Sequence, residues 1–356
     1  MRIIFSFIWV FLVTTTPMMA QTRGSECPDT QFTEWGMNGV VTPGMSNRLR
    51  GEPSTSGAVL GTLPAGEVFN VMYASSTCAE GYLWVEVRTL EQTGWTVERP
   101  IDEDEPFVIP YESPEPREIG QRLDDGSYLI DEGGLYMEIP ASLDVEQVWL
   151  AERIGFFGNT MSAQPSSVTL SFINSDEESL ADIQILPYAI SETVRELYWD
   201  YLPLETLLTE QPDLAEYASR NQMPQAPIGG VAALFGGATI YLPFNEGMGL
   251  RYLTFFAQDW VLFEPDYSLT YLYRGLTNDL AFFIAGEQRG VSIPEGTIPD
   301  PVNRGDDALY GAYTDEFSAN LNALPTSAFT PDLALIDTLM SSLTITDNDL
   351  LMALIP

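Results

Sequence analysis

Residues 50–71, with the sequence RGEPSTSGAVLGTLPAGEVFNV, alternate short apolar runs with closely spaced turn residues. The run AVLGTL is typical of a strand, PAGE of a turn, and VFNV of the strand that follows. The same spacing continues downstream, where LWVEVRT and GWTVE are two further strand-like runs. Over residues 34–99 this pattern predicts a small all-β barrel.

The order and spacing of many of these positions resemble bacterial SH3-like (SH3b) domains. The positions that agree with that pattern are Arg50, Pro53, Ser54, Val59, Gly61, Leu63, Gly66, Val71, Trp84, Val87, Gly94 and Trp95. One position departs from it, because the family usually places Asn two residues before the motif Arg, whereas this chain has Arg48 there and Asn47 one residue earlier. The resemblance implies an SH3b-like β-barrel domain over residues 27–99.

The resemblance also implies an extracytoplasmic module that binds a cell-wall peptide or glycan, or docks another envelope protein, and is not itself an enzyme. Aromatic side chains suit such ligands, because their flat faces pack against both peptides and sugars. The candidate ligand-binding residues are therefore Tyr73, Tyr82, Trp84 and Trp95. In the alternative interpretation, the two tryptophans fill the interior of the barrel.

Residues 1–20 have the three parts of a signal peptide. Arg2 supplies the positive charge, IIFSFIWVFLV is the apolar segment, and TTTPMMA ends at Ala20. An uncleaved membrane anchor is the alternative, but the apolar run has only about half of the roughly 20 residues that span a bilayer. We therefore expect a protein that is secreted or held in the cell envelope, outside the cytoplasm.

The chain has two cysteines, Cys27 and Cys78. Cys27 follows RGSE, which lacks the Leu and small residues typical of a lipid-attachment site. Export to an oxidising compartment favours pairing of an even number of cysteines. We expect a disulfide between Cys27 and Cys78 that staples the N-terminal tail to the first domain.

Residues 100–118, PIDEDEPFVIPYESPEPRE, hold five Pro and seven acidic residues, which is typical of a semi-rigid linker. Residues 119–356 contain the strand-like runs SYLI, LYMEI, SVTLSFI, ADIQILPY, TIYLPF, GLRYLTFFA, SLTYLYRGL and LAFFIAG. Helical patterns occur in SETVRELYWDYLPLETLLTE and in TPDLALIDTLMSSLT, the second with Thr330 as the predicted N-cap. The predicted fold class is multi-domain: a small SH3-like barrel, then an α+β domain of unknown function with an antiparallel sheet.

Two stretches of this larger part, GMGLRYLTFFAQDW and YLYRGLTNDLAFFIAG, together with the C-terminal PDLALIDTLMSSL, resemble a domain that follows SH3b modules in uncharacterised bacterial envelope proteins. More distantly, the strand order resembles the PsbP-like α+β fold. Neither resemblance brings a catalytic motif, and a fold does not by itself give a function.

The composition excludes most catalytic sites. The chain has no His, and all 15 of its basic residues are Arg. Ser-His-Asp triads, His-ligated metals, Schiff bases and Walker A loops are therefore impossible. Two cysteines are also too few for an iron-sulfur cluster or an all-cysteine zinc site. We expect no cofactor, no metal centre and no enzyme of these kinds, which leaves carboxylate-based hydrolysis as the main catalytic chemistry.

The formal net charge of −36 restricts the partners. Nucleic acid and anionic membrane surfaces both require a basic face, so we exclude both as partners. A hydrophobic content of 45% indicates that this charge covers the surface of a folded core.

Several weaker signals have plain explanations. Acidic residues in polar loops are expected to serve solvation: Asp124 with Asp125, Asp176 with Glu178, and Asp306 with Asp307. Residues 102–105 and 347–348 lack the ligand spacing of a calcium loop, and the Gly-rich run 228–238 lacks the GxGxxG spacing of a nucleotide site. Tyr198, Trp199 and Tyr201 are expected in the core, with a partner surface as the alternative.

Three functions remain open from the sequence. The first is a non-enzymatic extracytoplasmic binding protein whose SH3b module recognises a cell-wall or protein ligand. The second is a carboxylate-based glycan hydrolase that its SH3b module targets, and it requires two carboxyl groups facing each other across a cleft. The third is a structural secretory protein without a specific ligand.

Overall fold

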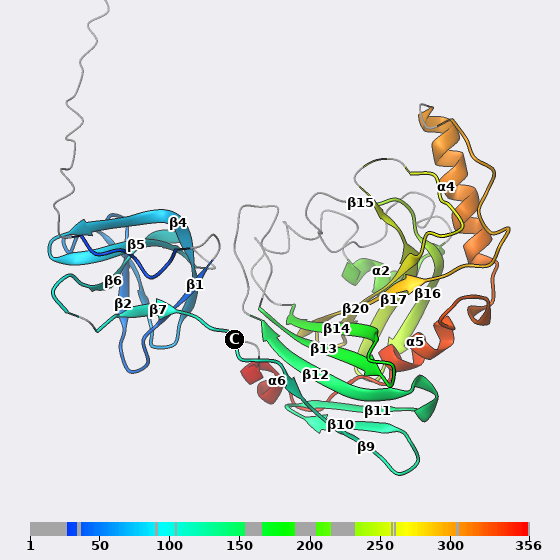
Figure 1. Ribbon diagram of the computed structural model, residues 1–356, viewed down its shortest axis with the longest axis horizontal. Coiled ribbons are helices and arrows are strands. Elements are labelled where there is room, and N and C mark those ends of the chain that lie inside the picture. Colours follow the sequence, from blue (N-terminus) through cyan, green and yellow to red (C-terminus); the bar gives the residue numbers. More distant parts are fainter. Residues whose placement is uncertain are drawn as a thin grey trace, which may run out of the picture.

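The computed structural model describes two groups of strands, which Figure 1 shows in blue and cyan for the first and in green to red for the second. We call them the N-terminal unit (residues 27–110) and the larger unit (residues 117–354). None of the described helices is long and apolar enough to cross a membrane. The described residues are 27–33, 37–89, 92–103, 105–153, 166–188, 204–214, 232–257, 259, 261–303 and 306–354. The predicted signal peptide lies outside them.

The N-terminal unit is a seven-stranded antiparallel sheet with the strand order β3-β2-β6-β5-β4-β1-β7. Its strands are β1 (Asn38–Val41), β2 (Asn47–Arg50), β3 (Val59–Leu63), β4 (Val68–Ala79), β5 (Tyr82–Arg88), β6 (Thr93–Pro100) and β7 (Val108–Pro110). The prediction of a closed barrel is not met, because the edge strands β3 and β7 form no ladder with each other within the described residues. Strand-like runs indicate how many strands form, and not whether the two edges meet.

The predicted linker contributes strands to both units. At its start, β7 pairs with β1, and Val108 is fully buried in the N-terminal core. At its end, β8 (Arg117–Glu118) pairs with β12 (Val145–Arg153) of the larger unit. The segment between these two strands is therefore only residues 111–116.

The N-terminal tail is fixed to its sheet at two points. The predicted disulfide between Cys27 and Cys78 is confirmed, and it closes a loop between residues 51 positions apart. At the second point, the buried carboxylate of Glu98 on β6 accepts hydrogen bonds from Thr30 Oγ1 at 2.5 Å and from Gln31 N at 3.1 Å. These two attachments hold the tail against the end of the sheet.

The larger unit is built on an eight-stranded antiparallel sheet with the order β16-β17-β19-β20-β14-β13-β12-β8. Its further strands are β13 (Ser167–Asn174), β14 (Ser179–Pro187), β16 (Gly237–Phe244), β17 (Gly247–Thr254), β19 (Leu269–Thr277) and β20 (Phe282–Val291). The antiparallel sheet predicted for this part is therefore confirmed. The run VEQVWLAER of β12 was missed, because its polar residues interrupt the apolar pattern.

Both faces of the interior strands are buried. Leu250 and Tyr252 point to one face and join an apolar layer under the helix α2 (Leu204–Glu210). Leu253 points to the opposite face and joins the main core of the unit. Strands buried on both sides read as nearly continuous apolar runs, which is what β17 and β19 show.

A second layer covers the main core on the face opposite α2. It consists of a four-stranded sheet, β21-β11-β10-β9, and of three helices. The members are β9 (Gln121–Arg122), β10 (Tyr128–Glu132), β11 (Leu135–Ile139), β21 (Thr344–Ile345), α4 (Asp307–Asn322), α5 (Leu333–Ser341) and α6 (Asn348–Leu354). The short strands β15 (Ala232–Ala233) and β18 (Phe256–Ala257) form a separate pair.

The start of α5 differs from the prediction. Asp332, not Thr330, is the N-cap, and its side chain accepts a hydrogen bond from Ala334 N at 2.9 Å. Thr330 is instead bound to Ser292 in an isolated β-bridge. Ser, Thr and Asp are all good caps, so the sequence alone did not separate two candidates only two residues apart.

One close approach on the sheet requires glycine. A Cβ atom at Gly249 of β17 would lie 2.2 Å from the ring of Tyr273 on β19. The absence of a side chain lets the tyrosine ring lie flat over its neighbouring strand, where its hydroxyl donates to Leu242 O at 3.2 Å.

We expect removal of the disulfide to destabilise the N-terminal unit alone. In the variant Cys27→Ser/Cys78→Ser, the unfolded chain regains the freedom of a 51-residue loop, which corresponds to a loss of about 4 kcal/mol in the free energy of unfolding. Amide hydrogen exchange followed by mass spectrometry resolves the two units within the full chain. Faster exchange in peptides from β4 to β6 with unchanged exchange in β17 to β20 is the expected result, and equal loss in both would contradict it.

Glu98 gives the N-terminal unit a defined pH dependence. Burial raises the pKa of the Glu98 carboxyl above its ordinary value of 4.5, against the hydrogen bonds from Thr30 and Gln31. The folded unit then binds the proton more tightly than the unfolded chain, so this contribution to stability is complete below about pH 4.5 and is lost as the pH rises through the raised pKa.

The variant Glu98→Gln removes this titration, so we expect the stability difference between wild type and variant to change across that pH range. Urea unfolding at a series of pH values measures it, with Glu86→Gln on β5 as the control. A difference that stays constant with pH would show that Glu98 does not titrate as described.

Candidate functional site

The aromatic residues predicted to bind a ligand lie on adjacent strands of the N-terminal unit. Trp84 on β5 is 1% exposed, and its Nε1 donates to Ala79 O at 3.1 Å. Tyr82 packs edge-on against it with ring centres 6.4 Å apart and is half-buried. Trp95 on β6 is also half-buried and pairs with Arg50 of β2. Tyr73 lies on β4, and its side chain is outside the described residues.

These positions separate the three aromatic side chains that the structure describes. Trp84 occupies the interior, as in the alternative in which tryptophan fills the fold. Tyr82 and Trp95 keep part of their rings accessible, so they are the members of the predicted set that are able to contact a ligand in the structure as it stands.

The loop between β2 and β3, residues 51–58, is braced next to these rings. At one end Arg50 donates from Nη1 to Gly57 O at 2.7 Å. In the middle of the loop Thr55 N donates to the Glu80 carboxylate at 2.7 Å, and Ser54 Oγ does so at 3.0 Å. The hydrogen bonds from Thr55, and secondarily from Ser54, hold the pKa of Glu80 below its ordinary value, so this acceptor stays ionised.

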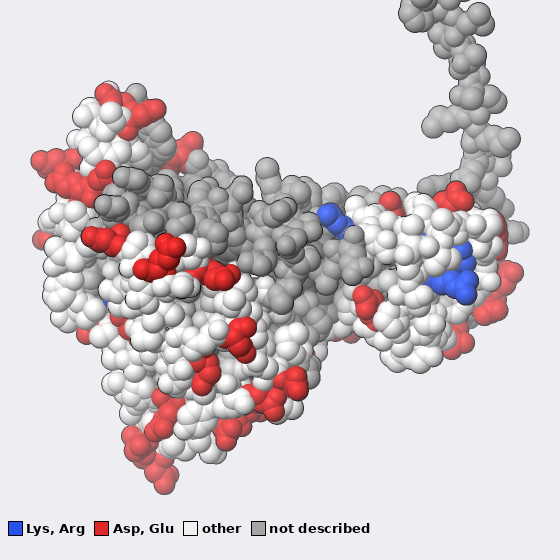
Figure 2. Space-filling view, turned by 180° about the vertical axis from the view of Figure 1, so that it is seen from behind, with Lys and Arg blue, Asp and Glu red and all other residues white. Residues whose placement is uncertain are grey.

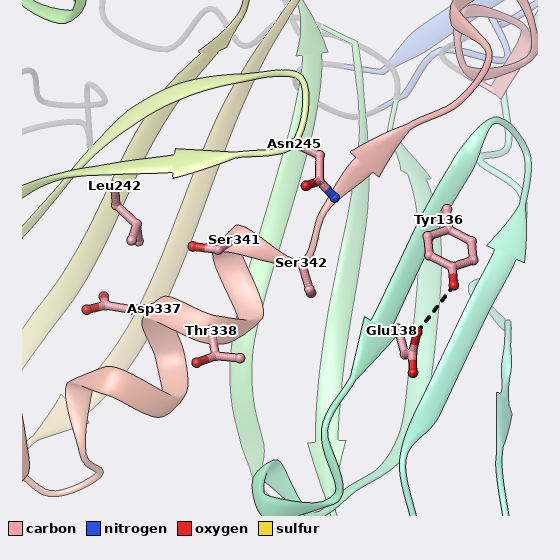
Figure 3. A pocket seen from close by; sticks show the side chains of 8 residues that line it. All are labelled: Tyr136, Glu138, Leu242, Asn245, Asp337, Thr338, Ser341 and Ser342. Atoms are coloured by element: carbon pink, nitrogen blue, oxygen red, sulfur yellow. Dashed lines mark hydrogen bonds between the residues drawn. The ribbon is translucent and has the colours of Figure 1, made fainter.

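A second candidate site is a groove of about 560 Å³ on the larger unit (Figure 3). Three elements meet there: β11, the β16–β17 hairpin, and the end of α5. The lining residues are Tyr136, Glu138, Leu242, Asn245, Asp337, Thr338, Ser341 and Ser342. None of them is basic, and most offer hydroxyl, amide or carboxylate oxygens.

Much of the polar lining is already engaged by the protein. Thr338 Oγ1 donates to Ala334 O at 2.7 Å, and Ser342 Oγ donates to Leu339 O at 2.8 Å, both within α5 and its end. Asn245 donates to Thr344 Oγ1 at 2.5 Å. The Tyr136 hydroxyl donates to Glu138 Oε2 at 3.4 Å, so the groove offers a ligand the Glu138 carboxylate as an acceptor and the Ser341 hydroxyl as a donor or acceptor.

Asp337 connects the floor of the groove to the interior. Its Oδ2 lies 3.2 Å from Arg251 Nη2 of β17, and its Oδ1 accepts a hydrogen bond of 2.9 Å from the Tyr271 hydroxyl of β19. Arg251 is 3% exposed and also donates to Ala238 O. The ion pair therefore ties α5 to β17, next to the edge strand β16 of the eight-stranded sheet.

Burial sets the protonation of this cluster. It raises the pKa of Asp337, although Arg251 and the Tyr271 hydroxyl act in the opposite direction. It also raises the pKa of Tyr271 well above the ordinary value, so the tyrosine stays protonated and acts as the donor. The three groups form a buried hydrogen-bonded network, in which Arg251 Nε is left without a partner, rather than a poised acid or base.

The groove does not have the form that a carboxylate-based hydrolase needs. Glu138 and Asp337 both line it, but Figure 3 shows them at opposite sides, with Thr338 and Ser342 between them in this view. Both carboxylate oxygens of Asp337 are bound to Arg251 and Tyr271. A catalytic pair requires two carboxyl groups that face the same bond, and nothing here favours one.

The other acidic residues serve the local structure or the surface. Figure 2 shows acidic side chains spread over this face of the molecule rather than gathered in one cleft. Asp125 accepts from Ser127 N at 3.0 Å, and Asp306 caps α4 by accepting from Ala308 N at 3.1 Å. Among the described residues, no group of three or more acidic or cysteine side chains is placed to hold a metal ion.

The remaining sequence signals are only partly covered by the structure. Tyr198, Trp199 and Tyr201 lie outside the described residues, as does the first part of the Gly-rich run. From that run, Gly237 begins β16, where a Cβ atom would lie 2.6 Å from the Leu321 side chain of α4. Its smallness thus permits close packing of a helix on a strand.

Comparisons with known proteins return nothing: no protein-family model, no curated protein and no solved structure matches the chain. The SH3-like and envelope-domain resemblances therefore stay predictions. The sequence does not indicate the Arg251–Asp337–Tyr271 cluster, because Asp337 lies 66 residues from Tyr271 and 86 residues from Arg251, and no motif links the three.

The Arg251–Asp337 ion pair is expected to contribute to the free energy of unfolding. Asp337→Asn leaves the buried Arg251 without its counter-charge, so we expect a loss of about 3–5 kcal/mol in the free energy of unfolding. The double variant Arg251→Met/Asp337→Leu removes both charges and is expected to be more stable than Asp337→Asn. Urea unfolding measures both, with the exposed neighbour Thr338→Ala as the control. If Asp337→Asn behaves like Thr338→Ala, the pair does not stabilise the fold.

Proposed function

We propose that the protein is a non-enzymatic, extracytoplasmic binding protein whose N-terminal unit is an SH3-like module. In this proposal the module recognises a cell-wall peptide or glycan, or the surface of another envelope protein. The observation that carries it is the pair of half-buried rings, Tyr82 and Trp95, beside the braced loop 51–58 on an antiparallel sheet.

Half-buried aromatic rings are well suited to binding a ligand. A ring held on a strand contributes a large contact area and loses little conformational freedom on binding. The adjacent loop is fixed by hydrogen bonds at Thr55 and Gly57, so the surface beside the rings needs little ordering when a ligand binds.

Two further features support an extracytoplasmic binding role. The signal-like N-terminus and the disulfide between Cys27 and Cys78 both suit an oxidising compartment outside the cytoplasm. The absence of His and Lys removes the usual catalytic side chains, and the groove of the larger unit offers no opposed pair of carboxyl groups.

Co-sedimentation of the full chain with insoluble cell-wall sacculi tests the proposal. We expect wild type to bind, and Trp95→Ala and Tyr82→Ala each to weaken binding roughly ten-fold, as for an aromatic contact at the centre of an interface. Because the contact is apolar, binding should persist at high salt. Tyr136→Ala, in the groove of the larger unit, is the matched control and should bind like wild type.

The alternatives give distinct outcomes. Loss of binding in Tyr136→Ala but not in Trp95→Ala would move the site to the groove and overturn the proposal. Release of soluble sugar from sacculi, abolished by Glu138→Gln, would instead establish the glycan hydrolase. Melting temperatures of all variants show whether each remains folded.

A further inference from the structure

Arg274 on β19 is a buried cation that forms no ion pair among the described residues. It is 2% exposed, and its Nη1 donates to Tyr273 O at 2.8 Å and to Gly286 O at 3.1 Å. Its Nε has no hydrogen-bond partner. Within the part of the chain that the structure describes, no carboxylate lies within ion-pair distance of it.

The surroundings of this guanidinium are mostly apolar. Its cross-strand neighbours are Leu250 on β17 and Ala285 on β20, and Leu272 and Leu276 flank it along its own strand. The same apolar layer contains the buried leucines of α2 and the segment after it, namely Leu204, Leu207, Leu208 and Leu214. A positive charge thus lies inside a layer of leucine side chains.

Beyond Ala285, the same row of the sheet becomes polar. Gln184 on β14 is paired with Ala285, and Thr169 on β13 is paired with Gln184. Gln184 donates from Nε2 to Ser167 Oγ at 2.8 Å. Across the sheet, Arg274 therefore lies between the apolar Leu250 on one side and, beyond Ala285, neutral hydrogen-bonding side chains on the other.

Arg251 provides the internal comparison. It lies on the opposite face of the same sheet, is equally buried, and has the carboxylate of Asp337 at 3.2 Å. A buried charge without a partner is costly, by several kcal/mol, and buried charges in proteins are normally paired. Both arginines have an unpartnered Nε, but in the described part of the chain only Arg251 has a carboxylate, and this difference needs an explanation.

We propose that the layer between α2 and the sheet binds an amphipathic carboxylate, whose carboxylate pairs with Arg274 and whose hydrocarbon tail lies among the surrounding leucines. The guanidinium supplies a charge-assisted hydrogen bond to the carboxylate. Leu250, Leu272 and Leu276 supply apolar contact. This inference concerns the larger unit and does not depend on the proposed function of the N-terminal unit.

The described cover over this layer includes one short helix, which in the proposal shifts to admit the hydrocarbon tail. In the described residues the helix on this face is α2, which has seven residues. An isolated helix of that length is not stable in water, so its position depends on the packing of its leucines. A hydrocarbon tail offers those leucines an equivalent apolar surface, so α2 can shift without leaving them exposed.

The charge of the chain predicts an unusual salt dependence. At a net charge of −36, the protein repels a carboxylate at long range, and salt screens that repulsion. Binding at Arg274 is therefore expected to become tighter as the salt concentration rises, which is the opposite of binding to an exposed basic patch.

Octanoate is the probe for this site, and isothermal titration calorimetry on the full chain measures its affinity. We expect wild type to bind octanoate, and to bind the uncharged octanol more weakly. Arg274→Met is expected to weaken octanoate binding roughly ten- to hundred-fold, as for loss of a hydrogen bond to a charged group. Arg48→Gln, at an exposed position of the N-terminal unit, removes one positive charge elsewhere and should bind like wild type.

The melting temperature without ligand separates a binding role from a structural one. If Arg274 serves a ligand, Arg274→Met removes an unpaired buried charge, and the melting temperature stays equal or rises. A lower melting temperature, or failure to fold, would show that the guanidinium holds the carbonyls of Tyr273 and Gly286 and would overturn the inference. Absence of octanoate binding to wild type, or equal binding to Arg274→Met, would overturn it as well.

Discussion

Burial of both faces of the eight-stranded sheet is the constraint on which the larger unit depends. Side chains alternate along each strand, so the central strands fill two apolar layers at once. Any polar group on these strands has to find its partners inside the protein. The structure meets this demand for Arg251 through Asp337 on α5, and this pair fixes where the helix lies on the sheet.

The N-terminal unit has a smaller apolar core than the larger unit. The buried apolar residues of its cluster all lie between Phe32 and Val108. A small core leaves a fold marginal, and a disulfide adds stability by restricting the unfolded chain. The tail joins this unit through Cys27 and through Glu98, so covalent and polar attachments supplement a limited apolar core.

The two units offer different surfaces for recognition. The N-terminal unit has two half-buried rings beside a braced loop, and the larger unit has a groove of oxygen acceptors and a buried guanidinium within leucines. None of these arrangements places two reactive groups against each other. The proposed binding functions rest on these surfaces.

The sequence by itself determined the elements and the excluded chemistries. Alternation and turn residues located most strands, including β17, and the two cysteines indicated their own pairing. These signals are local, because each depends on neighbours in the chain or on the count of a residue type. The strand β12 and the N-cap of α5 were not predicted correctly, because their local sequence patterns are ambiguous.

Only the tertiary structure decided the open strand order of the N-terminal sheet, the partner of Asp337 and the isolation of Arg274. Arg251 and Asp337 are 86 residues apart, and each looks like an ordinary surface charge in the sequence. Whether a charge is paired, buried or exposed depends on which strands and helices pack together, and that packing follows from the whole chain. The sequence therefore gives the groups available for chemistry, and the fold decides which of them meet.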